Sequence, residues 1–145
     1  MNYFARLGMV ALCAVALGIA GCQTTTTSSH QFSEPSAAWM TKTGQLAYKD
    51  QKLSLIGEVL VRYSKQGDLE LTFTKAGGIT LLSLRQDSGF GKAEGPMARR
   101  GWSGPLAQAP AHLQGWFQLR DKIVNARSGS MVRHEAGEQS FTVRF

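Results

Sequence analysis

Two neighbouring stretches alternate apolar and polar residues, and this pattern constrains the fold more than any other feature. Successive side chains point to opposite faces of a strand, so a period of two indicates a strand with one buried face. In residues 53–63 the apolar face would carry Leu53, Leu55, Val59, Val61 and Tyr63. In residues 69–74 it would carry Leu69, Leu71 and Phe73. Glycine-containing turn sequences follow at 64–68 and 75–78, before an apolar strand at 79–84. The pattern predicts an antiparallel meander.

The rest of the chain adds a helix and a second hairpin. Residues 110–124 change to a helical period, with Leu113, Trp116, Phe117 and Ile123 or Val124 on one face. Strands are predicted at 131–135 and 140–145, a short strand within 90–98, a loop or strand edge at 99–104, and a short helix at 36–43. We therefore expect an α+β fold, in one domain of residues 36–145, with a helix packed on an antiparallel sheet.

Residues 1–21 are typical of a bacterial signal peptide. Arg6 is the only charged side chain before residue 34, and residues 7–20 are apolar or small. This stretch is shorter than the roughly 20 apolar residues of an ordinary membrane-spanning helix. Ile19-Ala20-Gly21-Cys22 resembles the lipobox of bacterial lipoproteins, which implies cleavage before Cys22 and acylation of its thiol and new amino terminus. An uncleaved anchor, or an ordinary secretory signal followed by a chance cysteine, is the alternative.

The residues after the lipobox indicate where the protein is held. An Asp after the acylated cysteine resembles the inner-membrane retention signal of enteric-type bacteria, and this chain has Gln23 there. We therefore expect the outer membrane, with the domain on its periplasmic face. Residues 22–35 are polar and rich in threonine and serine, which predicts a flexible tether. As a random coil its ends would lie roughly 20 Å apart. An edge strand formed by the threonines is the alternative.

Side chains suited to catalysis or metal binding are sparse. Cys13 would leave with the signal peptide and Cys22 would be acylated, which excludes cysteine catalysis and cysteine metal sites. The histidines at positions 30, 112 and 134 lack the spacing of metal ligands, and no phosphate-binding loop or nucleophile elbow occurs. We therefore expect no enzyme, no metal and no cofactor. The net charge of +6 is scattered along the chain, which argues against nucleic-acid binding.

Three segments of the predicted meander resemble the LolA/LolB family, and more closely its lipid-anchored LolB branch. They are residues 44–48 (GQLAY), 63–71 (YSKQGDLEL) and 75–84 (KAGGITLLSL). The resemblance implies an incomplete, strongly curved β-barrel with helices on its open side. Its apolar interior would hold acyl chains of lipoproteins received from a soluble periplasmic carrier, so side chains must not fill it completely. The residues that would line this interior are Leu55, Val59, Val61, Leu69, Leu71, Phe73, Leu82, Leu84 and Trp116.

Two departures from the family leave a second hypothesis open. Gly77 stands where the family's protruding loop carries an exposed leucine, and the chain is shorter than full-length members. The first hypothesis is a monomeric protein that binds acyl chains for lipoprotein reception or localisation. The alternative is an interaction module with a filled core, tethered to the outer membrane for envelope assembly. Its contact surface would be an exposed patch of Trp102, Arg99 and Arg100. An apolar void behind the sheet favours the first hypothesis, and close packing favours the second.

Overall fold

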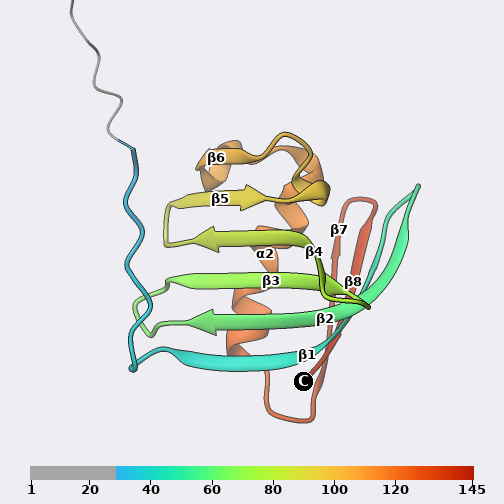
Figure 1. Ribbon diagram of the computed structural model, residues 1–145, viewed down its shortest axis with the longest axis horizontal. Coiled ribbons are helices and arrows are strands. Elements are labelled where there is room, and N and C mark those ends of the chain that lie inside the picture. Colours follow the sequence, from blue (N-terminus) through green and yellow to red (C-terminus); the bar gives the residue numbers. More distant parts are fainter. Residues whose placement is uncertain (1–28) are drawn as a thin grey trace, which may run out of the picture.

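A computed structural model describes residues 29–145 as one antiparallel sheet and one long helix (Figure 1). The eight strands lie in the order β6-β5-β4-β3-β2-β1-β8-β7. The elements are β1 (Met40–Lys49), β2 (Ser54–Tyr63), β3 (Leu69–Lys75), β4 (Ile79–Gln86), β5 (Phe90–Glu94), the 3₁₀ turn η1 (Pro96–Ala98), β6 (Trp102–Pro105), the 3₁₀ turn η2 (Leu106–Gln108), α2 (Ala111–Asn125), β7 (Met131–Ala136) and β8 (Gln139–Arg144).

The predicted meander is confirmed. In the β2–β3 pair, Val61 lies opposite Leu71 and Tyr63 lies opposite Leu69, so the apolar side chains of both strands share one face. Gly77 and Gly78 form the β3–β4 turn with φ angles of 92° and 79°, which only glycine adopts without strain. The prediction that the first apolar residues of the 53–63 segment are buried is wrong. Leu53 lies in the β1–β2 turn with 41% of its surface exposed, and Leu55 is only partly buried.

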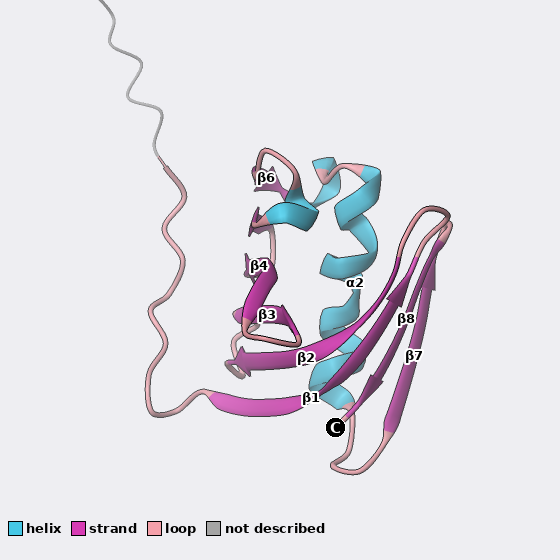
Figure 2. Ribbon diagram, turned by 45° about the vertical axis from the view of Figure 1, so that its right-hand side comes forward, coloured by secondary structure: helices cyan, strands magenta, loops and turns pink. Residues whose placement is uncertain are grey.

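The final hairpin extends the sheet beyond its first strand. Strand β8 pairs with β1, which places Val143 opposite Leu46 and Phe141 opposite Tyr48. The two ends of the sheet, β6 and β7, do not pair with each other, so the barrel stays open. Figure 2 shows the curved sheet wrapping around α2, which lies in its concavity. The α+β class and the curved antiparallel sheet with a helix on its open side are therefore confirmed.

Helix α2 covers the concave face with one apolar stripe. It begins at Ala111, directly after Pro110, whose fixed φ suits the first turn of a helix. Its buried residues are Leu113, Gly115, Trp116, Phe117, Leu119 and Ile123. This is the periodicity that the sequence predicts. No helix in residues 29–145 is long and apolar enough to cross a membrane.

The predicted helix at 36–43 is wrong, because strand β1 begins at Met40 and pairs with β2 over its whole length. Long-range pairing here overrides the weak local signal. The structure also defines two other predicted segments. The strand predicted within 90–98 ends at Glu94 and is followed by η1. The segment 99–104, predicted as a loop or strand edge, ends in the edge strand β6, which pairs with β5.

Residues 30–35, the last part of the predicted tether, form no helix or strand but contact the domain, and we call them the strap. The strap lies against the convex side of the sheet, where His30 stacks on Phe90 with ring centroids 4.2 Å apart. Phe32 meets the His30 ring edge-on at 4.8 Å, and Arg85 donates a hydrogen bond of 2.8 Å to the Ser33 carbonyl. Most of the strap stays exposed, and Phe32 and Pro35 are its half-buried residues. The predicted signal peptide, and residues 22–28 with the predicted lipidation site Cys22, lie outside the described residues.

Candidate functional site

The residues predicted to line an acyl-chain interior do come together on the concave face. Leu55 is half-buried at the edge of this cluster, and the other eight expose no more than 1% of their surface. The eight are Val59, Val61, Leu69, Leu71, Phe73, Leu82, Leu84 and Trp116. Two clefts that open on the described part of the chain are lined by none of the nine residues. The predicted face therefore exists, and its side chains contact protein atoms.

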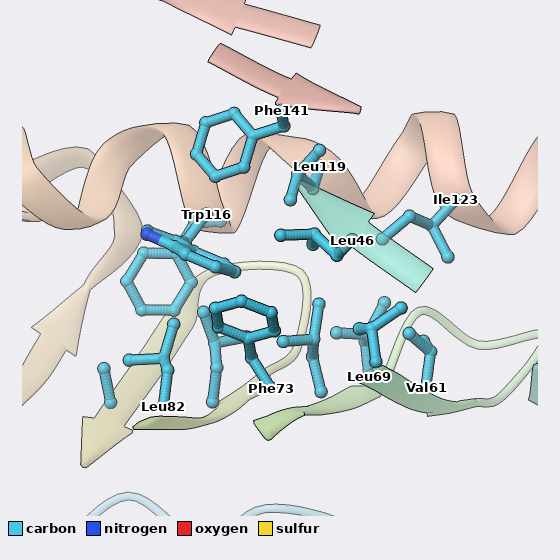
Figure 3. Close-up of a cluster of buried hydrophobic side chains, with 14 of the residues drawn as sticks. Leu46, Val61, Leu69, Phe73, Leu82, Trp116, Leu119, Ile123 and Phe141 are labelled. Atoms are coloured by element: carbon cyan, nitrogen blue, oxygen red, sulfur yellow. The ribbon is translucent and has the colours of Figure 1, made fainter. Parts of the chain in front are cut away.

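Side chains of α2 fill the concavity (Figure 3). The Trp116 ring stacks on Tyr48 at a centroid distance of 5.1 Å and meets Phe141 edge-on at 5.0 Å. It also lies 5.5 Å from the Phe73 ring. Aromatic rings prefer these offset and edge-on arrangements at such separations. The cluster thus has the ring geometry of a packed protein core around Trp116.

Two glycines show how closely α2 approaches the sheet. A Cβ atom at Gly115 would lie 2.6 Å from the Gln139 side-chain oxygen and 2.7 Å from the Phe141 ring. A Cβ atom at Gly91 would lie 2.6 Å from the Phe117 ring. Both separations are well inside van der Waals contact. Glycine is therefore needed at both positions for the helix to lie at its present depth.

Polar side chains hold α2 at both ends and in the middle. At its C-terminal end, the Lys42 ammonium donates to the carbonyls of Ile123 and Ala126 at 2.7 and 2.6 Å. These carbonyls lie in the last turn and at the C-cap of α2, at the negative end of the helix dipole, so a cation there is stabilising. In the middle, the Gln86 side chain on β4 donates to the Phe117 carbonyl at 3.2 Å.

Gln139 on β8 holds the first turn of α2. Its amide nitrogen donates to the His112 carbonyl at 2.9 Å and to the Tyr48 hydroxyl at 3.0 Å. Its oxygen accepts a hydrogen bond of 3.3 Å from the Gly115 N–H. The Tyr48 hydroxyl in turn donates to Asp50 at 2.8 Å. Buried hydrogen bonds of this kind specify one position of the helix on the sheet.

A polar cleft of about 680 Å³ opens next to this first turn. It lies between the β1–β2 turn, the β7–β8 turn, the start of α2 and the loop after η1. Its volume is in the range of small-molecule and peptide sites. We call it the hairpin cleft, and it is lined by Asp50, Gln51, Lys52, Arg99, Ala111, His112, Gln114, Gln118, Ala136, Gly137, Glu138 and Gln139. Its two acidic and two basic residues balance in charge.

The acidic side of the hairpin cleft is largely occupied by internal hydrogen bonds. The backbone N–H of Lys52, followed by the Tyr48 hydroxyl and the Leu53 N–H, holds the pKa of Asp50 below its usual value of 3.8. Burial raises the pKa of Tyr48 to about 12, so the hydroxyl stays protonated and donates. Gln51 donates to Glu138, which joins the two turns across the cleft. Both carboxylates therefore act mainly as scaffolding.

The groups of the hairpin cleft without a partner among the described residues are two cations, an amide and the Nε2 atom of His112. The side chains of Lys52, Arg99 and Gln118 make no hydrogen bond or ion pair within residues 29–145. Arg99 has a φ angle of 60° and a ψ angle of −106°, an unfavourable backbone conformation for a residue with a side chain. Burial, reinforced by the Arg99 charge, lowers the pKa of His112, so its ring stays neutral beside the guanidinium.

The prediction of an exposed patch around Trp102 is wrong for Trp102 itself. The Trp102 ring is half-buried and meets Phe117 edge-on at 5.4 Å, so it packs on the core. Arg99 and Arg100 are exposed, and of the two only Arg99 lines the hairpin cleft. The sequence offered no motif for this cleft, because two turns and a helix start that are distant in the chain form it. No group of three or more metal-binding side chains occurs within residues 29–145.

Comparison with known protein families and with curated proteins found no family model and no curated protein that matches this chain.

Proposed function

We propose that this protein is an interaction module of the cell envelope, held on the outer membrane through lipid on Cys22 and binding its partner without covalent chemistry. The packing of α2 into the concave face carries this proposal, because neither of the two clefts described above is lined by the residues of that face. The larger of the two, the hairpin cleft, offers Lys52, Arg99 and Gln118, which have no side-chain partner within residues 29–145. These groups suit a polar partner segment rich in amide, hydroxyl or carboxylate groups.

Site-specific photo-crosslinking in intact cells tests this proposal. We expect a photoreactive residue in place of Gln118, in the hairpin cleft, to give a discrete crosslinked product. The matched control is the same residue in place of Glu58, which is exposed on the convex face of β2. The double variant Lys52→Gln/Arg99→Gln should remove most of the product at position 118. Equal products at positions 58 and 118, or a product insensitive to the double variant, would contradict the proposal.

A second function, acyl-chain binding as implied by the resemblance to the LolA/LolB family, is supported by a different observation. The seven fully buried strand residues of the predicted lining form one apolar face, and α2, which carries Trp116, is the element that covers it. A helix that moved away would expose this face to lipid delivered by a periplasmic carrier. Under this proposal, Lys42 and Gln139 act as latches on the two ends of the helix.

Loosening the latches distinguishes the two functions. If α2 is a movable cover, the variants Lys42→Ala and Gln139→Ala should bind a fluorescent fatty acid several-fold more tightly than the unchanged protein. Lys49→Ala, on the exposed end of β1, is the control. Mass spectrometry of lipid extracted from the purified domain gives an independent measurement. Absence of bound lipid, together with no gain in the latch variants, would leave the interaction module as the function.

A further inference from the structure

The strap makes specific contacts at one end of the sheet. The Nε2 atom of His30 forms a hydrogen bond of 2.5 Å with Asp87, in the β4–β5 turn, while its ring stacks on Phe90. The Arg85 guanidinium lies 5.3 Å from the centre of the Phe32 ring, a cation–π distance. A polypeptide segment held by stacking, an ion pair and a backbone hydrogen bond has a defined position on the domain.

The anchoring residues on the sheet are themselves fixed. Arg85 also pairs with Glu70 at 3.1 Å, and Glu70 pairs with Arg62, so a row of alternating charges crosses β2, β3 and β4 on the convex face. Asp87 accepts hydrogen bonds from the Gly89 and Phe90 N–H groups, which fix its carboxylate in the turn. The strap therefore binds a preorganised surface.

Docking of the strap shortens the chain between the lipid site and the folded domain. His30 follows Cys22 by 8 residues, which span at most about 29 Å when fully extended. Met40, the first residue of β1, follows Cys22 by 18 residues, which span at most about 65 Å. Contacts of His30 and Phe32 with the sheet thus reduce the greatest possible reach of the domain by more than half.

The strap and the hairpin cleft lie at opposite ends of the strands. In a meander, consecutive turns alternate between the two ends of the sheet. The β4–β5 turn, which holds the strap, is therefore at the same end as the β2–β3 turn, and the β1–β2 turn is at the other end. The hairpin cleft includes the β1–β2 turn. A strand of 10 residues such as β2 separates the ends by about 33 Å.

We propose that the strap orients the domain on the membrane, with the β2–β3 and β4–β5 turns facing the lipid surface and the hairpin cleft facing away from it. This inference rests on the proposed lipid anchor at Cys22. The short linker keeps the strap end within reach of the headgroups, and the length of the strands holds the cleft a further strand length outward. A partner in the periplasmic space then meets an open cleft.

Energy transfer to labelled lipid measures this orientation. The full chain, processed and acylated in cells, is reconstituted into vesicles of phosphatidylethanolamine and phosphatidylglycerol that carry an acceptor dye on the headgroup. A donor dye is attached through Lys65→Cys, in the β2–β3 turn, or through Ala76→Cys, in the β3–β4 turn, both exposed. The 7 residues of β3 separate the two turns by about 23 Å, so we expect roughly two-fold higher transfer from position 65.

The strap variant His30→Ala/Phe32→Ala should bring the two transfer efficiencies close to equality. The variant Gln31→Ala, at an exposed strap position, is the matched control and should keep the difference. Mass spectrometry of the peptide with Cys22 separates two kinds of failure. A Cys22 without lipid overturns the anchor and the orientation together. An acylated Cys22 with equal transfer from both labels, or with a difference that the strap variant leaves unchanged, overturns the orientation alone.

Discussion

Helix α2 and the strap lie against opposite faces of the same sheet, and different interactions hold them. The helix buries six residues in the core and has polar contacts at its ends and middle. The strap has two exposed or half-buried aromatic rings, a contact of His30 with Asp87, an ion pair of Glu34 with Arg85, and one hydrogen bond to its backbone.

This comparison separates an integral part of the fold from a docked segment. Each aromatic contact of the strap is worth about 0.5–1.5 kcal/mol, and an exposed ion pair is worth about 0–1 kcal/mol. The strap contributes no residue to the core, so loss of its contacts would leave the domain folded, whereas α2 cannot leave without exposing the core.

The largest expected effect is at Trp116, which joins α2 to both halves of the sheet. The substitution Trp116→Ala removes a ring that contacts Tyr48, Phe73 and Phe141. We expect the free energy of unfolding to fall by about 3–5 kcal/mol, as for other large cavities in cores. Urea denaturation followed by circular dichroism measures this loss. A loss below about 1 kcal/mol would mean that α2 is not part of the core, and the comparison above would fail.

The second prediction concerns the depth of the helix at Gly115. Alanine is favoured over glycine in a helix by about 1 kcal/mol, yet its methyl group would overlap Gln139 and Phe141. Overpacking costs about 1–3 kcal/mol, so we expect Gly115→Ala to be destabilising by up to about 2 kcal/mol. Gly89→Ala is the control, since nothing lies within 4 Å of its added methyl group. Increased stability of Gly115→Ala would show that α2 packs loosely.

The third prediction is the pH dependence of stability. Burial lowers the pKa of His112 and of His134 below 6.5, so the unfolded chain takes up protons first as the pH falls. The unfolding free energy should therefore decrease below about pH 6.5. Tyr48 has its pKa raised from 10.0 to about 12, so the unfolded chain loses this proton first and stability should also decrease above pH 10.

Thermal unfolding across this pH range checks both limits. The double variant His112→Gln/His134→Gln should reduce the loss of stability below pH 6.5, and Tyr48→Phe should reduce the loss above pH 10. If the histidine variant loses as much stability at acidic pH as the unchanged protein, the assignment to these two imidazoles is contradicted.

The smallest expected effect on stability is at the strap. Phe32→Ala removes contacts with His30 and Arg85, and we expect the free energy of unfolding to change by less than about 1 kcal/mol. The same substitution should shift the NMR signals of residues 30–35 to values typical of a flexible chain, whereas Gln31→Ala should not. Loss of several kcal/mol on Phe32→Ala would place the strap in the folding unit with α2.

The sequence predicted those parts of the fold that have their own periodicity. The alternation in β2 and β3 and the helical stripe in α2 depend on local patterns. Strand β1 was missed at its start because Lys42 occupies an inward position. Its charge is explained only by the helix end that it contacts in the folded protein. The strap was missed because the contacts that order it lie with Arg85 and Phe90, more than 50 residues along the chain.

The candidate site was harder to predict than the fold. An apolar face can be recognised from alternation, but whether it is filled depends on the volume that α2 brings, above all Trp116. The hairpin cleft carries no sequence signal, since Lys52, Arg99 and Gln118 become neighbours only after the sheet closes on α2. Which polar side chains of the cleft already have a partner depends on hydrogen bonds such as those of Gln139. The spacing of residues in the sequence does not reveal these bonds.

The pairing of β8 with β1 has a consequence for how the protein matures. Leu46 and Val143 are neighbours in the sheet but are separated by 97 residues of chain. Closing so long a loop is slow, and strand β1 has no partner on that side until the final strand is available. Under the proposed lipid anchor at Cys22, the N-terminal end would therefore be held on the membrane while the last strand completes the sheet.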